Sequence, residues 1–213
     1  MTSRNLVKLF MSTLLVGGLT TGVVGFIVRW KEFESIFTSF DFLEILSVLF
    51  WLIGVGFIFS VLSQAGFFAY LTVHRFGLGI FKSRTLWNAV QVILVLFVLF
   101  DLVYLRYNAF ANDGDSIWPY IGIAVFILVV GVVVAAIKAK MTNKEAFIPA
   151  VFFMVVVTTI EWVPVLRVNE VSWVYLMIFP LLICNAYQLL ILQKLNQDSQ
   201  AQRNKATTKK PAK

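Results

Sequence analysis

Long apolar stretches, separated by short polar segments, make up most of this chain. A run of about twenty apolar residues forms a helix long enough to cross about 30 Å of hydrocarbon. Such windows lie near residues 6–28, 43–72, 86–108, 117–138, 147–166 and 173–194. The pattern therefore predicts an all-α, polytopic integral membrane protein, with a bundle of about six transmembrane helices in residues 1–195.

The first two windows and the C-terminal segment have unusual boundaries. The first window follows basic residues, as a secretion signal does, but no small-x-small cleavage site follows it, so we expect an uncleaved helix. The second is too long for one perpendicular crossing, so we expect it to tilt, to extend into the cytoplasm or to break near SQAG at 63–66. Residues 196–213 are polar and lack aromatic side chains, which predicts a disordered, basic, cytoplasmic tail.

The composition agrees with a membrane protein. Hydrophobic residues make up 60% of the chain and charged residues only 14%, which is unusual for a soluble domain. The single cysteine, Cys184, excludes a disulfide framework, and one cysteine with one histidine does not make a usual zinc-ligand set. We therefore expect no metal and no cofactor.

The positions of lysine and arginine predict the orientation, because positive residues near the ends of spans resist translocation. Fourteen of the eighteen lie in the two terminal segments, in the connections after the second and fourth windows, or in the adjoining ends of those windows. Most acidic residues lie in the opposite connections. We expect both termini to be cytoplasmic and the protein to be a multi-pass protein of the cell (cytoplasmic) membrane. Anionic membrane lipids account for the net charge of +7, so no nucleic-acid partner is expected.

Two acids lie inside the predicted spans, each followed by an arginine. Counted along ideal helices, Asp101 and Glu161 reach about the same depth, roughly 21 Å from the inner boundary. Arg106 and Arg167 follow at five and six residues, spacings that place neither pair on one helical face, so a salt bridge would have to cross between helices. The acids either fasten helices together or carry a proton, an ion or a ligand, and both interpretations stay open.

Five amide side chains form a second group of candidate residues. They are Gln64, Asn88, Gln91, Asn185 and Gln188. Asn88 and Gln91, and likewise Asn185 and Gln188, are three residues apart and share a helix face. They either form interhelical hydrogen bonds or line a polar vestibule that opens to the cytoplasm.

The first window carries a small-residue pattern. Gly18 and Gly22 form a small-xxx-small pair, with Gly25 on the next turn, which predicts close helix packing. The chain contains no HExxH, GxSxG or Walker A motif, so we expect no catalytic residues and no enzyme activity.

Four stretches resemble a known family. They are FDFLEILSVLFWLIGVG (40–56), AGFFAYLTVHRFGLGIF (65–81), FIPAVFFMVVVTTIEWVPVLRVN (147–169) and PLLICNAYQLLIL (180–192). They are similar to the KinB-signalling pathway activation protein family (KbaA) of spore-forming bacilli. The resemblance implies a membrane protein without catalysis, needed for the activity of the sensor histidine kinase KinB, which feeds the phosphorelay that initiates sporulation. It implies no particular site residue.

Three functions remain as hypotheses. In the first, the protein activates a KinB-type sensor histidine kinase through lateral contact between transmembrane helices. In the second, it is a small proton-coupled transporter or permease that uses Asp101 and Glu161. In the third, it is a membrane chaperone or assembly factor for the kinase. Self-association into a homo-oligomer is compatible with each of them.

Overall fold

The fold is described from a computed structural model that covers residues 2–112 and 114–208. All regular elements in this part of the chain are helical, and several spans contain short 3-10 or π segments. In order they are α1 (Ser3–Val28), α2 (Trp30–Thr38), α3 (Phe42–Phe81), α4 (Arg84–Phe100), η1 (Asp101–Leu105), α5 (Arg106–Phe110), α6 (Trp118–Met141), η2 (Lys144–Ala146), α7 (Phe147–Phe152), η3 (Phe153–Val157), α8 (Thr158–Val168) and α9 (Val171–Thr208).

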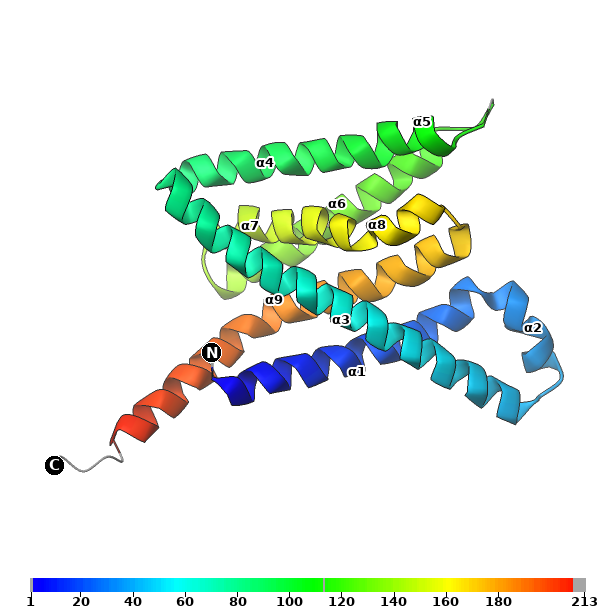
Figure 1. Cartoon of the computed structure of the whole chain (residues 1–213), viewed down its shortest axis with the longest axis horizontal. Helices are drawn as coiled ribbons and strands as arrows, with labels where there is room; N and C mark the ends of the chain where they lie inside the picture. Colours follow the sequence, from blue (N-terminus) through cyan, green and yellow to red (C-terminus); the bar gives the residue numbers. More distant parts are fainter. Residues whose placement is uncertain (1, 113, 209–213) are drawn as a thin grey trace.

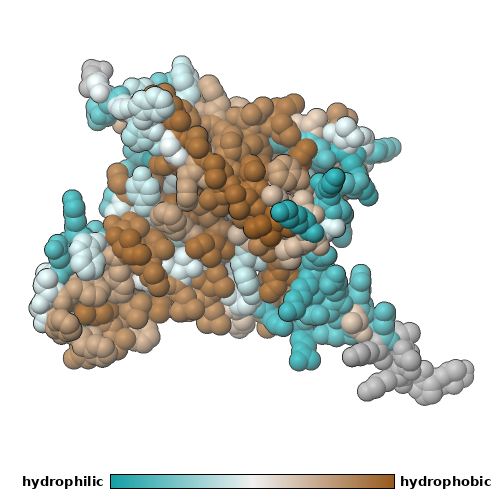
Figure 2. Space-filling view, turned by 180° about the vertical axis from the view of Figure 1, so that it is seen from behind, coloured by the Kyte–Doolittle hydropathy of each residue, from teal (hydrophilic) through white to brown (hydrophobic). Residues whose placement is uncertain are grey.

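Six helical segments are long and apolar enough to cross a membrane, as the hydrophobic pattern predicts. They are Ser3–Val28, Phe42–Phe81, Arg84–Phe110, Trp118–Met141, Lys144–Val168 and Val171–Asn204. Hydrophobic residues cover the middle of the molecular face in Figure 2, and hydrophilic residues gather towards its two ends. The prediction of an all-α bundle of six apolar helices is therefore confirmed.

The second segment forms one unbroken helix. α3 contains 40 residues. It continues without interruption through residues 63–66, where a helix break had been one of the possibilities. At 1.5 Å per residue it is about 60 Å long, roughly twice the thickness of a hydrocarbon layer. The side chain of Asp41 caps its start, and Lys82, which has a left-handed conformation, follows its last residue. Figure 1 shows α3 crossing the other helices diagonally, so that it packs on α1 and α9 and also reaches α4 and α8.

The last two segments form the centre of the bundle. In their most apolar windows 61% of the residues are buried, against 22% to 33% in the four other segments. Fully buried side chains from both segments meet there, among them Phe153, Trp162, Leu176 and Leu181. The four other segments surround this pair and expose much of their apolar surface.

The ends of the helices fall into two groups. In Figure 1 the N-terminus, the turn from α3 to α4, the turn from α6 to α7 and the end of α9 lie towards the left. The remaining turns, including α2, lie towards the right. The start of α1 and the end of α9 therefore lie at the same end of the bundle as the α3–α4 and α6–α7 connections, which carry most of the basic residues outside the terminal segments.

The first part of the segment 196–213 is helical, whereas its composition predicts disorder. α9 continues beyond residue 195 as far as Thr208. The reason is a contact with the beginning of α1: Ser199 is buried, and its Oγ accepts hydrogen bonds from the backbone N–H of Thr2 (3.1 Å) and from Asn5 Nδ2 (2.8 Å). Asn5 Nδ2 also donates to the carbonyl of Leu195 (3.1 Å). The rest of the expected tail, 209–213, lies outside the described residues.

α1 and α3 approach each other closely through glycines. Gly18, Gly22 and Gly25 all face α3: a Cβ atom added to them would lie 2.6 Å from Phe57, 3.1 Å from Leu49 and 2.4 Å from Leu52 respectively. Two glycines outside the small-residue pattern, Gly17 and Gly56, bring the backbones of the two helices close together. A Cβ on Gly56 would lie 2.6 Å from the carbonyl oxygen of Gly17, which is backbone and has no alternative rotamer.

We expect Gly56→Ala to lower the free energy of unfolding by about 1–3 kcal/mol, because the added methyl group forces α1 and α3 apart. Unfolding of the detergent-solubilised protein, followed by circular dichroism, measures the change. Gly54→Ala is the matched control, since a Cβ there meets nothing within 4 Å. We expect this control either to leave the free energy of unfolding unchanged or to raise it by up to about 1 kcal/mol, because alanine has a higher helix propensity than glycine. Equal losses in the two variants would contradict close packing at Gly56.

Candidate functional site

A buried network of polar side chains joins three helices in the centre of the bundle. Asn185 on α9 is fully buried. Its Nδ2 donates to Thr158 Oγ1 (2.9 Å) and to Glu161 Oε2 (2.7 Å), both on α8. Its Oδ1 accepts a hydrogen bond from Ser63 Oγ (2.7 Å) on α3. One asparagine therefore fastens α3, α8 and α9 together.

Gln188 extends this network along α9 by one turn. It is fully buried, and its Nε2 donates to Ser63 Oγ (2.6 Å) and to the carbonyl of Cys184 in its own helix (3.3 Å). Ser63 thus accepts from Gln188 while it donates to Asn185. The spacing of three residues between Asn185 and Gln188 places both amides towards α3, in agreement with their expected shared face.

Glu161 occupies a position shaped by a glycine. Its side chain is buried, with 4% of its surface exposed. A Cβ atom on Gly66 of α3 would lie 1.9 Å from Glu161 Oε1, so only glycine leaves room for the carboxyl group. Oε1 has no hydrogen-bond partner among the described residues. The carboxyl group is therefore held by Asn185 on one side and by contact with α3 on the other.

The two acids are not brought together, and neither pairs with an arginine of the described residues. Asp101, half-buried at the start of η1, makes no side-chain hydrogen bond or ion pair with any residue that the structure describes. Arg106 instead donates from Nη2 to Asn169 Oδ1 (2.6 Å) and lies 5.2 Å from the centre of the Tyr120 ring. Arg167 is exposed on α8. The structure instead pairs Arg29 with Glu32 and Arg84 with Glu145.

The remaining amides lie apart from this network. Gln64 is buried on α3, and its Nε2 donates to the carbonyl of Phe10 on α1 (3.5 Å). Gln91 lies 3.4 Å from His74 Nδ1, which also accepts a hydrogen bond from Trp87 Nε1 (3.1 Å). Because Nδ1 accepts, the hydrogen of this imidazole is on Nε2.

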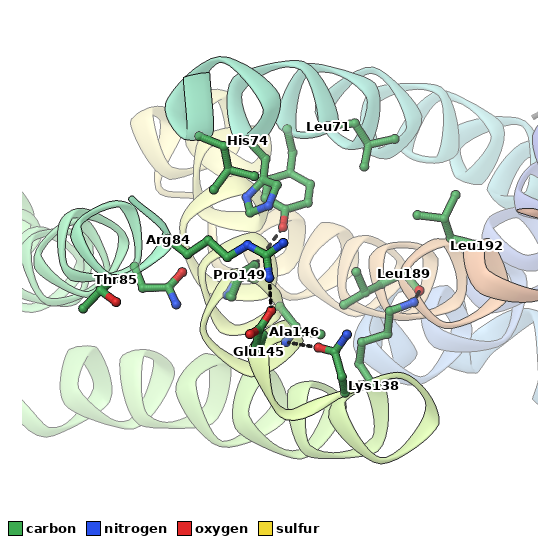
Figure 3. Close-up of a pocket in the computed structure, with 15 residues that line it drawn as sticks. Leu71, His74, Arg84, Thr85, Lys138, Glu145, Ala146, Pro149, Leu189 and Leu192 are labelled. Carbon is green, nitrogen blue, oxygen red and sulfur yellow. Dashed lines mark hydrogen bonds and ion pairs between the residues drawn. The ribbon is translucent and has the colours of Figure 1, made fainter. Parts of the chain in front are cut away.

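A cavity of about 490 Å³ is lined by residues around the α3–α4 and α6–α7 turns. Figure 3 shows its walls, which come from α3, α4, α6, α7, α9 and the turn that precedes α7. Its polar and charged lining includes Tyr70, His74, Arg84, Asn88, Lys138 and Glu145. Of the five amide candidates, only Asn88 lines this cavity. The amides therefore do not form the walls of a polar vestibule here, as one of the two interpretations of them suggested.

Two smaller cavities lie together at the opposite end. One, of about 240 Å³, is lined by Arg106, Tyr120 and Asn169, and the other, of about 340 Å³, is lined mainly by apolar side chains such as Phe126 and Phe179. Pro119, Ile123 and Tyr175 line both. Neither Asp101 nor Glu161 lines these cavities or the larger one.

Several residues of the network were not among the residues predicted from the sequence. Ser63, Thr158 and Gly66 are absent from the predicted candidates, although Ser63 and Gly66 belong to the SQAG stretch, where a helix break was one of three expected possibilities. Hydroxyl and glycine residues are common in apolar helices, so their presence alone does not mark a site. The one usable signal was the spacing of Ser63 and Gly66, which places them on one face of α3.

Comparisons with known proteins give consistent results. The family model described as "KbaA: KinB-signalling pathway activation in sporulation" matches residues 17–195. The chain is also similar to the KinB-signaling pathway activation protein of Bacillus subtilis (strain 168), with 52% identity over 194 residues, which cover 91% of this chain and 98% of that protein. No solved structure gives a significant match.

Proposed function

The chain belongs to the KbaA family, and from this membership we propose that it activates a KinB-type sensor histidine kinase from within the cytoplasmic membrane. The matched relative carries KinB-pathway activation in its name and is covered almost completely. Six apolar helices of spanning length support a multi-pass location. In this proposal the protein has no catalysis of its own, and residues 1–195 form its membrane domain.

The proposed orientation places both termini in the cytoplasm. The termini, the α3–α4 turn and the α6–α7 turn share one end of the bundle, and this end carries most of the lysine and arginine residues. Positive residues are retained on the cytoplasmic side, so this end is the inner one. The opposite end, with α2 and the cavity around Arg106, then faces outwards.

Lateral contact between helices is the proposed mechanism. The polar groups of the Asn185 network are buried, so they hold this protein together and are not offered to a partner. The surfaces available to a kinase helix are the apolar outer faces of the surrounding helices, for example Phe50 and Ile58 on α3, which are 65% and 67% exposed. Activation further requires that the protein bind the active state of the kinase more tightly than the inactive state, because equal affinity shifts no equilibrium.

The transporter hypothesis receives less support from the geometry. A proton-coupled pair of carboxyl groups needs a shared path, whereas Asp101 and Glu161 have no contact and line none of the three cavities described above. Family membership also favours a signalling role over transport. A chaperone role for the kinase is separated from activation by the experiment that follows.

Deletion of the gene in its own host tests the proposed function. We expect the phosphorylated fraction of the KinB-type kinase and the sporulation frequency to fall, while the amount of kinase in the membrane stays constant. Immunoblotting of membranes and a phosphorylation assay measure these quantities in the same culture, and a strain with the gene restored is the control. A parallel fall in kinase abundance would identify a chaperone, and unchanged phosphorylation would rule out activation.

A further inference from the structure

Lys138 near the end of α6 is a buried cation without a counter-ion among the described residues. Its side chain is only 8% exposed, and Nζ donates to the carbonyl oxygen of Leu189 on α9 (2.7 Å). An ammonium group has three N–H donors, and this is its only hydrogen bond to a described residue. No carboxylate in the described part of the chain lies within ion-pair distance. Buried charges in proteins are usually paired with a further group.

The ammonium group borders the large cavity at the basic end of the bundle. Figure 3 shows Lys138 extending from α6 towards Leu189 on one side of this cavity and Arg84 on another. Arg84 and Thr85 belong to the first turn of α4, where Ser83 caps the N–H of Leu86; the helix dipole and the remaining N–H groups of this turn attract negative charge. Three separate features of the cavity, one ammonium group, one guanidinium group and one helix N-terminus, therefore favour an anion.

The charge of the lining limits what this anion can be. Lys138 and Arg84 are cationic, and Glu145, which pairs with Arg84, is the one carboxylate among the described residues of the lining. The two cations exceed this carboxylate by one charge, which a singly charged anion would balance. Leu71, Leu78 and Leu192 line the same cavity and provide apolar contact next to the charged groups.

We propose that this cavity binds a phosphate group, supplied either by the headgroup of an anionic phospholipid or by a free phosphate. The inference depends on the proposed membrane location, which places the cavity at the inner leaflet. A phosphodiester carries one negative charge, hydrogen-bonds to ammonium and guanidinium groups, and is joined to apolar chains. Bound there, it would connect the start of α4 with the end of α6.

Binding to the purified full-length protein tests this proposal without the kinase, so its failure is distinct from failure of the proposed function. The protein in uncharged detergent is titrated with phosphatidylglycerol, phosphatidylcholine or inorganic phosphate. Native mass spectrometry counts bound lipid, and the rise in Tm reports binding of any of the three. We expect one phosphatidylglycerol per chain, bound about tenfold more tightly than phosphatidylcholine, because the choline ammonium opposes the cations.

Matched variants locate the site. Lys138→Met is expected to weaken phosphatidylglycerol binding about tenfold or more, whereas Lys138→Arg retains it. Lys140→Met is the control, since it removes the same charge from an exposed position two residues away. Arg84→Gln is also expected to weaken phosphatidylglycerol binding. Because the Arg84 side chain is exposed, this second variant tests the site without a substitution in the core.

The outcomes separate the two sources of phosphate. A rise in Tm with millimolar inorganic phosphate that is lost in Lys138→Met supports a site for free phosphate. A response to phosphatidylglycerol alone, lost in the same variant, supports a lipid site. Equal binding by the wild-type protein, Lys138→Met and Arg84→Gln would overturn the proposal.

Discussion

Replacement of Asn185 by leucine is expected to lower the free energy of unfolding strongly, because the side chain joins three helices. Three interhelical hydrogen bonds are lost together, to Thr158, to Glu161 and from Ser63. Single bonds of this type contribute about 0.6–1.7 kcal/mol in membrane proteins, so we expect a total loss of about 2–5 kcal/mol. Unfolding in mixed detergent micelles, followed by loss of helical circular dichroism, measures it.

Asn88→Leu is the matched control for this prediction. It makes the same chemical change at a half-buried position whose side chain forms no hydrogen bond with the described residues. Its expected effect is within about 0.5 kcal/mol of zero. If Asn185→Leu were as mild as Asn88→Leu, the network would not be a principal connection between α3, α8 and α9.

Glu161→Gln and Glu161→Leu are expected to have opposite outcomes. Glutamine keeps an oxygen that accepts from Asn185 and fits beside Gly66, so we expect a change below about 1 kcal/mol and nearly normal kinase phosphorylation. Leucine leaves Asn185 Nδ2 without this acceptor and places a branched side chain against α3. We expect it to destabilise the protein by about 1–3 kcal/mol and to reduce kinase phosphorylation to near the level of the deletion strain.

These two variants also test the transport hypothesis. A proton-coupled carrier needs an ionisable group at this position, so loss of function in a stably folded Glu161→Gln protein would support transport. Full activity of Glu161→Leu would contradict both the fastening role and the proton-carrying role. Protein abundance in the membrane, determined by immunoblotting, shows whether each variant has folded.

The helices were predictable because length and hydropathy determine them. Each of the six apolar windows lies within, or within one residue of, a helix that the structure describes. The boundaries were less accurate where polar residues continue a helix. α3 extends to Phe81 through the sequence TVHRFGLGIF, which combines apolar residues with His74 and Arg75. α9 extends past residue 195 because Ser199 contacts α1, and a contact across the whole chain leaves no local pattern.

The relative positions of the two acids were not predictable for a different reason. Depth was counted along ideal α-helices, but π-helical turns interrupt two spans at Asp101–Leu105 and Phe153–Val157. A π turn contains additional backbone and rotates every residue beyond it around the helix axis. Asp101 lies within the first of these turns, and Glu161 follows the second. The face towards which each acid points therefore depended on irregularities that hydrophobic spacing does not reveal.

The burial of the last two segments has a consequence for biosynthesis. Ribosomes release the chain from its N-terminus, so α1, α3, α4 and α6 are made before Lys144–Val168 and α9, which form the centre of the bundle. Until α9 emerges, Ser63 lacks both of its partners on that helix, Asn185 and Gln188. In the proposed membrane location, the first four helices are therefore inserted before the last two segments can pack against their inner faces. Final assembly of the bundle is then a late step, which follows the synthesis of α9.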